Sequence, residues 1–249
     1  MHRCNTISAF YRTRWTVTVS LVYQQYMNFA AARANMVESQ IRTGGITDRR
    51  LIAAFAAVPR ELFVPPERRS VAYVDDNLLI KPANGSGPAR YLMEPMVSAR
   101  LIELAEIRAS GKVLHVGCGT GYATAILARL AREVIAIDED AGIARQAKSL
   151  LASLAVSNAR VIETSHAGGA PAEAPFDCIV VEGQIPAAPA SLLSQLAQDG
   201  RLVAVVGERA VATAMLYTRH GEATSARPAF EAAVRRLPGF AAERPAFVF

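Results

Sequence analysis

Three glycines at alternate positions interrupt the apolar sequence KVLHVGCGTGYATAILARL, which spans residues 112–130. Gly117, Gly119 and Gly121 follow a short run typical of a buried strand, and a helix-like pattern resumes after them. Because glycine has no side chain, the backbone N–H groups of such a strand-to-helix turn can approach a ligand closely. The turn therefore predicts a binding site for a nucleotide-like cofactor.

The spacing of the glycines and an acid on the following strand indicate which cofactor this is. The pattern is GxGxG, whereas a dinucleotide-binding turn has GxGxxG, and Tyr122 stands where its third glycine would be. Asp138 ends the next predicted strand, where a carboxylate can accept hydrogen bonds from both hydroxyls of a ribose. Together these features predict S-adenosylmethionine (SAM) as the cofactor and argue against a nicotinamide dehydrogenase.

The elements that must position these residues alternate regularly along the chain. Short β-branched runs predict strands at residues 112–116, 133–138, 160–163, 177–182 and 201–206, and amphipathic patterns predict helices at 120–131, 141–154 and 189–198. This order predicts an α/β fold with a doubly wound, mostly parallel sheet. Weaker patterns around residues 214–218 and 246–249 predict two further, antiparallel strands.

A helical segment precedes this core. The sequence ITDRRLIAAFAAV predicts a helix capped by Thr47, with its apolar residues on one face. The stretch NLLIKPANGSGPAR predicts a loop, and a helix follows from about residue 95 toward 107. We predict that residues 1–35 are a disordered leader or a mis-assigned start. Residues 36–249 then form one domain, with 36–110 as a helical and loop preface and 111–249 as the sheet core.

Composition excludes several other classes of protein. The 249 residues are 51% hydrophobic and carry a net charge of +5, but without the Lys/Arg run that nucleic-acid binding would need. The uncharged stretch 15–32 contains too many polar residues to span a membrane. Three cysteines without CxxC spacing and four scattered histidines argue against a metal site and for a reducing compartment. We expect a cytoplasmic monomer with no nucleic-acid or membrane partner.

Several longer stretches resemble the protein-L-isoaspartate O-methyltransferase family. They are MVESQIRTGGITD, VPRELFVP, AYVDDNLLI, VLHVGCGTGYATAILARL and APFDCIVVEGQIPAAPASLLSQLAQDGRLVAVVG, which lie between about residues 36 and 206. The resemblance implies a seven-stranded sheet of the SAM-dependent methyltransferase type. It also implies methylation of the free carboxylate that appears when an aspartyl or asparaginyl residue rearranges to isoaspartate. The implied partners are damaged proteins or peptides that carry isoaspartyl residues.

The chain departs from the family pattern where the methyl acceptor would bind. The family has a Thr-Ile-Ser-Gln-Pro-like segment whose Ser is treated as the active-site residue, and Met93 stands at that position here. Tyr91, Met93 and Glu94 are the implied substrate-facing residues, and the catalytic residue is left unassigned. Two interpretations of Met93 are open: a pocket that suits a different methyl acceptor, or a methionine that fills space under a lengthened loop.

Positions tied to the cofactor depart as well. Ser165 matches a family Asp that is expected to face the adenine amino group, and His166 follows it. His115 stands where most members carry an acid, and we interpret it as a structural histidine bonded to backbone amides of the glycine turn. We interpret Cys118 as a small side chain tolerated beside the cofactor rather than a reactive thiol. Whether Glu94 and Glu182 face the sulfonium or cap helix termini is open.

The sequence thus predicts a SAM-dependent methyltransferase that acts on isoaspartyl carboxylates. Such a carboxylate has a pKa of about 4, so it is an anion at neutral pH and needs no general base. The alternatives are a SAM-binding homologue with a different methyl acceptor and a non-catalytic SAM-binding protein.

Overall fold

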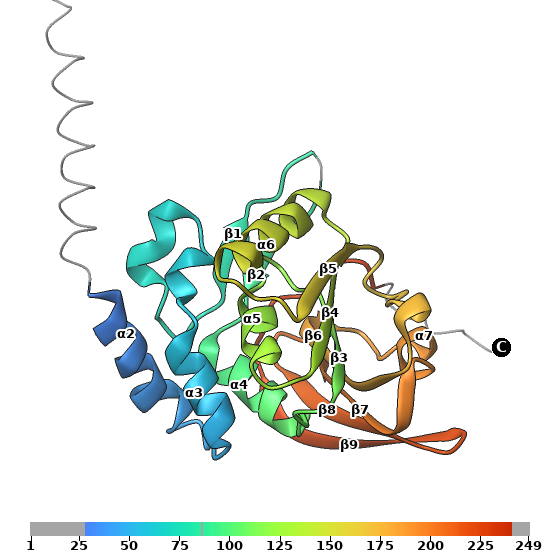
Figure 1. Ribbon diagram of the computed structural model, residues 1–249. Helices are drawn as coiled ribbons and strands as arrows, with labels where there is room; N and C mark the ends of the chain where they lie inside the picture. The colour runs from blue at the N-terminus through green and yellow to red at the C-terminus, as the bar shows by residue number, and fades with distance from the viewer. Residues whose placement is uncertain (1–27, 86, 241–249) are drawn as a thin grey trace, which may run out of the picture.

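The computed structural model describes residues 28–85 and 87–240, which fold around one large twisted sheet (Figure 1). This sheet has seven strands in the order β5-β4-β3-β6-β7-β8-β9. Strands β3 to β7 are parallel to one another, and β8 and β9 are antiparallel. The predicted mostly parallel, seven-stranded sheet is confirmed. The strands are β3 Lys112–Val116, β4 Glu133–Asp138, β5 Ala159–Glu163, β6 Phe176–Ile185, β7 Leu196–Val206, β8 Ala212–His220 and β9 Ala223–Ala232.

The central strand β3 shows why the apolar runs form a parallel sheet. Val113 packs into the layer beneath the N-terminal and central helices, whereas Leu114 and Val116 pack into the layer on the opposite face. A strand that is buried on both faces reads as a continuous apolar run. Val116 pairs with Ile137 of β4, so the carboxyl ends of the two strands meet at one edge of the sheet. The glycine turn and Asp138 are thereby brought together.

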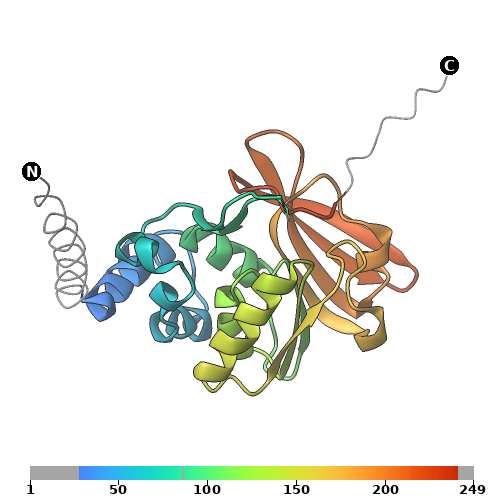
Figure 2. The same ribbon diagram turned by 90° about the horizontal axis from the view of Figure 1, so that it is seen from above.

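Helices cover mainly one face of the sheet. Figure 2 shows the blue-to-yellow helices on one side of it and the orange segment that holds α7 on the other. The predicted helix 120–131 is shorter in the structure, because Gly121 precedes it with a left-handed φ of 97°. Asp140 caps α6 by accepting hydrogen bonds from the Gly142 and Ile143 amides. The helices of this layer are α4 Pro95–Leu104, α5 Tyr122–Ala128 and α6 Ala141–Ser153.

The other face departs from the predicted helix at residues 189–198. Only α7, Ala190–Leu193, is helical, and β7 begins at Leu196. Leu196 pairs with Phe176 of β6, so strand pairing overrides the helical pattern of this stretch. A short 3-10 turn, η4 Pro171–Glu173, lies between β5 and β6.

Two antiparallel strands complete the sheet at its edge. The predicted strand around residues 214–218 is confirmed as part of β8. Its partner β9 was not predicted, because its residues are mostly exposed and include Pro228. The strand predicted at residues 246–249 lies outside the described residues.

The N-terminal layer begins earlier than predicted. Residues 29–35 belong to helix α2 and not to a disordered leader, while residues 1–27 lie outside the described residues. The cap of α3 is Asp48, whose side chain accepts from the Arg50 amide, and not Thr47, whose amide donates to Glu103 at 2.6 Å. The elements are α2 Phe29–Met36, the π-helical segment η1 Val37–Ile41, α3 Arg49–Ala57, and the 3-10 turns η2 Arg60–Leu62 and η3 Pro66–Val71.

The stretch predicted as a loop before α4 contains a small hairpin. Strands β1 Leu78–Lys81 and β2 Arg90–Leu92 pair antiparallel as a separate two-stranded sheet. Their alternating burial pattern explains the short apolar stretches that flank the Pro- and Gly-rich sequence. None of the helices within residues 28–85 and 87–240 has the length and apolar character to cross a membrane.

Candidate functional site

The glycine turn joins β3 to α5 in a backbone conformation that requires glycine. Gly117, Gly119 and Gly121 have φ of 76°, 54° and 97°, in the left-handed region that side chains disfavour. The Gly117 and Cys118 amides both donate to the Ile137 carbonyl at 3.0 Å, which ties the turn to β4. The predicted strand–turn–helix junction is thus present at the carboxyl edge of the sheet.

Asp138 lies directly against this turn and is fully buried. Its Oδ2 accepts a hydrogen bond from the Gly119 amide at 3.0 Å, and its Oδ1 accepts one from the Asp140 amide at 3.1 Å. The Arg90 guanidinium of β2 donates to both oxygens, with Nη1 2.6 Å from Oδ1 and Nη2 2.7 Å from Oδ2. A bidentate, charge-assisted pair of this kind is the stronger class of hydrogen bond. The predicted carboxylate therefore already has a cation bound to it.

Electrostatics keep Asp138 ionised. Burial alone would raise the pKa of Asp138, but the bidentate Arg90 guanidinium outweighs burial and holds this pKa well below its ordinary value. The His166 ring is fully buried, and its Nδ1 lies 2.9 Å from the Pro238 carbonyl. Its Nε2 accepts from the Glu139 amide at 3.2 Å and is 3.6 Å from Asp138 Oδ1. His166 is therefore next to Asp138, and its predicted contact with the cofactor remains a prediction.

Ser165 makes no contact with Asp138 among the hydrogen bonds described for it. The residue is exposed, and its Oγ accepts a hydrogen bond from the Gly168 amide at 3.4 Å within its own loop. Its predicted role at the adenine group remains a prediction.

His115 pairs with side chains and not with the backbone amides predicted for it. Its Nε2 donates to Glu182 Oε2 at 2.9 Å, and its Nδ1 is 2.9 Å from the Thr124 hydroxyl. The other Glu182 oxygen accepts from Ser98 Oγ at 3.4 Å. Glu182 thus neither caps a helix nor stands free; it links the carboxyl ends of β3 and β6 through the imidazole.

Cys118 has the properties of an inert side chain. It is buried, and burial raises the pKa of its thiol well above the ordinary value. A thiol in this protonation state is a poor nucleophile. This agrees with the interpretation of Cys118 as a small residue tolerated in the turn.

The predicted substrate-facing segment follows β2. Met93 is 3% exposed, and its carbonyl accepts a hydrogen bond from the fully buried Arg60 at 2.8 Å. Tyr91 and Met93 line a cavity of about 10 Å³ that Glu182 also lines, whereas Glu94 is not among its lining residues. Burial and the nearby Asp75 and Asp76 carboxylates raise the pKa of Glu94 to about 7, against an opposing effect of Arg60.

A C-terminal strap, which we define as residues 234–239, crosses the same edge of the sheet. The Gln184 amide donates to the Arg235 carbonyl, and the Leu237 amide donates back to the Gln184 carbonyl, both at 2.9 Å. Leu237 is so close to the glycine turn that a Cβ added at Gly117 would lie 2.6 Å from its methyl carbons. The strap therefore packs directly on the face of the turn that was expected to receive a cofactor.

Sequence reasoning missed Arg90, the strap and the pairing of His115 with Glu182. Arg90 and Asp138 are 48 positions apart, and nothing local in the sequence links them. One signal was available in the stretch ARYLMEP. Its alternating pattern places Arg90 on the buried face of β2 together with Leu92, and a buried arginine needs an acidic partner.

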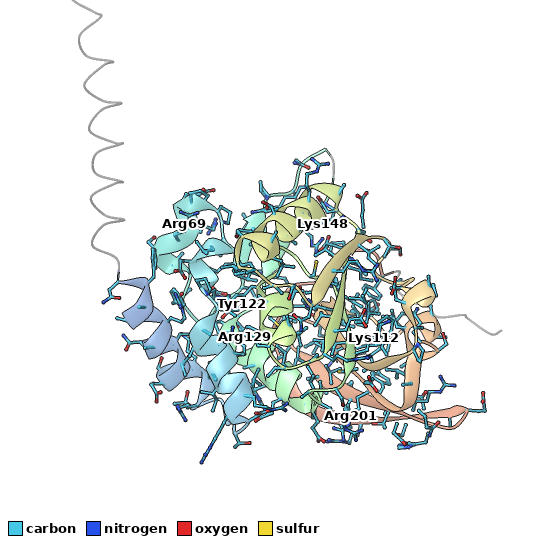
Figure 3. The ribbon with its side chains drawn as sticks, in the orientation of Figure 1. Arg69, Lys112, Tyr122, Arg129, Lys148 and Arg201 are labelled. Atoms are coloured by element: carbon cyan, nitrogen blue, oxygen red, sulfur yellow. The ribbon has the colours of Figure 1, made fainter. Side chains whose placement is uncertain are left out.

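Tyr122, which excludes the dinucleotide pattern, serves the core. Figure 3 labels it at the start of α5, between the sheet and the N-terminal helices. Its ring is fully buried, with the Phe55 and Phe63 rings 6.1 Å and 5.5 Å away and the Arg60 guanidinium 4.8 Å from its centre.

In the described part of the chain, no group of three or more His, Cys, Asp or Glu side chains is arranged to hold a metal ion.

This sheet order, with a GxGxG turn beside a buried carboxylate, defines an α/β domain of the methyltransferase type. A family model described as protein-L-isoaspartate(D-aspartate) O-methyltransferase matches residues 31–235. The chain belongs to this family.

Relatives agree with this assignment. A protein-L-isoaspartate O-methyltransferase of Methanoculleus marisnigri is 41% identical over 177 residues, which cover 71% of this chain and 78% of the relative. One from Methylorubrum populi is 40% identical over 191 residues, which cover 77% and 87%.

Among solved structures, a protein-L-isoaspartate O-methyltransferase superimposes with a TM-score of 0.73 at 22% identity, over 83% of this chain and 66% of the other. A Plasmodium falciparum structure, described as a candidate enzyme of this kind in complex with S-adenosyl-L-homocysteine, has a TM-score of 0.64 at 19% identity, over 82% and 97% of the two chains. At these identities the structures bear on the fold alone.

Proposed function

We propose that this chain transfers a methyl group from SAM to the free carboxylate of isoaspartyl residues in damaged proteins. The observation that carries the proposal is the left-handed glycine turn packed on Asp138, in a chain whose match to the family spans residues 31–235. Relatives about 40% identical carry the same activity in their names.

The residues at the carboxyl edge of the sheet fit the cofactor. The bare backbone at Gly117 and Gly119 would admit close approach once Leu237 of the strap has moved off Gly117, and Asp138 at the end of β4 is placed to accept from ribose hydroxyls once Arg90 has left it. SAM supplies a methyl group bound to a positively charged sulfur, which is its own leaving group. Ser165 and His166, which follow β5, complete the proposed cofactor-binding set with Gly121.

The chain's own contribution is to orient the acceptor and exclude water. The acceptor carboxylate is ionised at neutral pH, so no base is needed, and Met93 leaves the site without a hydroxyl at that position. Arg60 holds the Met93 carbonyl and the Ala72 carbonyl at 2.8 Å and 2.7 Å, which fixes the segment in front of α4. Positioning of this kind can supply about 7–11 kcal/mol of a reaction barrier.

Transfer of label from SAM tests the proposal. The purified chain is incubated with methyl-labelled SAM and an isoaspartyl peptide, with the matched aspartyl peptide as the control. We expect base-labile label only on the isoaspartyl peptide. Label on neither peptide, while SAM binding is measurable, would reject this acceptor.

A different methyl acceptor is the second candidate function, and the lack of the family hydroxyl at Met93 favours it. Met93 is buried in the core and, with Tyr91, lines the small cavity where the family has that hydroxyl. If Met93→Ser gains isoaspartyl activity that the natural chain lacks, the acceptor has changed. A non-catalytic SAM-binding protein is the third candidate, and turnover on any peptide would exclude it.

We further propose that the chain acts as a cytoplasmic monomer on protein substrates, with neither nucleic acid nor membrane as a partner. Cys118 and Cys178, the cysteines within the described residues, are both free and buried, which supports a reducing compartment. Light scattering coupled to size-exclusion chromatography should give a mass close to the 26.7 kDa of one chain. A mass near twice that value would reject the monomer.

A further inference from the structure

Asp138 has no acceptor position left for a ribose. Each carboxylate oxygen accepts one guanidinium N–H of Arg90 and one backbone amide, from Asp140 on Oδ1 and from Gly119 on Oδ2. A carboxylate offers about four acceptor positions in total. All of them are therefore in use while Arg90 stays in place.

Arg90 occupies the positions that two neighbouring hydroxyl groups would take. Its two N–H groups donate side by side to the two oxygens at 2.6 Å and 2.7 Å, as adjacent hydroxyls of a ribose would. The pair is withdrawn from water, because Arg90 is 4% exposed and Asp138 fully buried. The low dielectric of such a site strengthens the bond between them.

Arg90 also lines two cavities. One, of about 230 Å³, is lined by Gly87, Pro88, Arg90, Glu139, Asp140 and Pro238. The other, of about 10 Å³, lies among Arg90, Tyr91, Met93 and Glu182 beside the glycine turn and holds no more than a water molecule. Because Arg90 lines both, its withdrawal would free space beside Asp140 and beside Tyr91 and Met93.

The strap, residues 234–239, lies against the glycine turn and close to Arg90. Leu237 packs on Gly117 and Gly183, and the Arg235 guanidinium lies 5.1 Å from the centre of the Tyr91 ring, next to Arg90. The strap and β2 are thus in contact over the glycine turn. A displacement of the strap would therefore also disturb the contact of Arg235 with Tyr91.

We propose that Arg90 is an affinity-determining residue that competes with the cofactor's ribose for Asp138, so that the cofactor binds only after Arg90 has withdrawn. This inference rests on the proposed function. The measured affinity is then the affinity of the open form multiplied by the fraction of molecules in which Arg90 is displaced. Removal of Arg90 should therefore tighten binding, although the residue lies inside the site.

Calorimetric titration with S-adenosyl-L-homocysteine, the demethylated cofactor, tests this. We expect Arg90→Ala to bind at least about tenfold more tightly than the natural chain. Arg90→Lys, which keeps the charge but loses the bidentate fork, should fall between them. The matched control is Arg100→Ala, because Arg100 stacks on Phe230 at 3.8 Å, away from the site, and its loss should leave affinity unchanged.

Equal or weaker binding by a folded Arg90→Ala variant would overturn the proposal. Should that variant not fold, Arg90→Gln keeps one donor for Asp138 and must still bind more tightly than the natural chain. Leu237→Ala is the companion variant: it removes the strap contact but leaves the ion pair. A tenfold gain in Leu237→Ala with none in Arg90→Ala would place the competition at the strap and also overturn the proposal.

Amide hydrogen exchange separates this inference from the proposed function. The Gly119 and Asp140 amides donate to Asp138 beside Arg90, so their exchange should be faster in Arg90→Ala without any cofactor present. If neither protein binds the cofactor, the proposed function fails and the competition by Arg90 fails with it. If both proteins bind the cofactor with equal affinity and exchange is unchanged, the proposed function stands and the role of Arg90 fails.

Discussion

Asp138 holds the Arg90 guanidinium through both of its carboxylate oxygens. An acid at the end of a strand beside a glycine turn is a pattern of adjacent residues and adjacent strands, which the sequence displays. Arg90 comes from a hairpin 48 positions earlier, and only the folded chain brings the two together. The same holds for His115 and Glu182, which are 67 positions apart.

The pairing changes what an Asp138→Ala substitution should do. Removal of the carboxylate leaves the Arg90 guanidinium buried without a partner, so we expect a loss of about 3–5 kcal/mol in the free energy of unfolding. Urea denaturation measures this. Asp48→Ala, which removes a partly exposed helix cap, should cost only about 1 kcal/mol. A loss at Asp138 no greater than at Asp48 would contradict the buried pair.

The stability that ionised Asp138 contributes should decrease only on the acid side. The pKa of Asp138 is lowered in the folded state, so its stabilisation is present above the unfolded value of about 3.9 and is lost as the pH falls further. The difference in stability between the natural chain and Asp138→Ala should therefore shrink only below about pH 4.

Glu94 should act in the opposite direction. Its pKa is raised to about 7, so the folded state holds the proton more tightly than the unfolded state. Stability should therefore fall as the pH rises from about 4.3, the unfolded value, through about 7. Glu94→Gln cannot ionise, and its stability relative to the natural chain should grow between about pH 5 and about pH 8. Glu38→Gln, at an exposed position, should show no such trend.

At the scale of elements, the buried parallel strands were the most predictable part. Strand β3 matches its predicted bounds because it is continuous, apolar and buried on both faces. The helix predicted at 189–198 failed because its apolar spacing also suits a strand, and pairing of Leu196 with Phe176 decided between them. Strand β9 is held by pairing with β8 and not by burial, so it left no apolar pattern to detect.

The irregular end of β6 offers a test of the strap. Pairing between β6 and β7 shifts register between Val180 and Gln184, and Gly183 within this shift has a φ of 145°. A Cβ added at Gly183 would lie 2.7 Å from the Leu237 Cβ. Gly183→Ala should therefore displace the strap and cost about 1–3 kcal/mol in strain.

Amide exchange of Leu237, which donates to the Gln184 carbonyl, reports this displacement and should be faster in Gly183→Ala. Gly221→Ala is the matched control, because Gly221 has a φ of 62° but no atom near its Cβ position. Gly221→Ala should lose stability through backbone strain, but the exchange of the Leu237 amide should stay unchanged. Unaltered exchange at Leu237 in Gly183→Ala would mean that the strap does not depend on this contact.

At the scale of the whole molecule, the structure changes where we place the start of the folded domain. The sequence suggested residue 36, since the helical pattern and the family resemblance begin at about Met36. Helix α2 instead begins at Phe29, and Asn28 caps it by accepting from the Ala31 amide at 3.0 Å. We propose that Asn28 is the first residue that the domain needs.

Two truncated chains test this boundary. A chain that starts at Met27 keeps the cap and all of α2, and it should unfold at the same urea concentration as the full chain. A chain that starts at Met36 loses Arg33, which donates to Tyr73 at 3.0 Å and pairs with Glu61 at 3.3 Å. Because these groups are partly buried, we expect a loss on the order of 2 kcal/mol in the free energy of unfolding.

Arg33→Met in the full chain should reproduce most of that loss, since it removes the same contacts of Arg33 and keeps the helix. Equal stability of both truncated chains would return the boundary to residue 36.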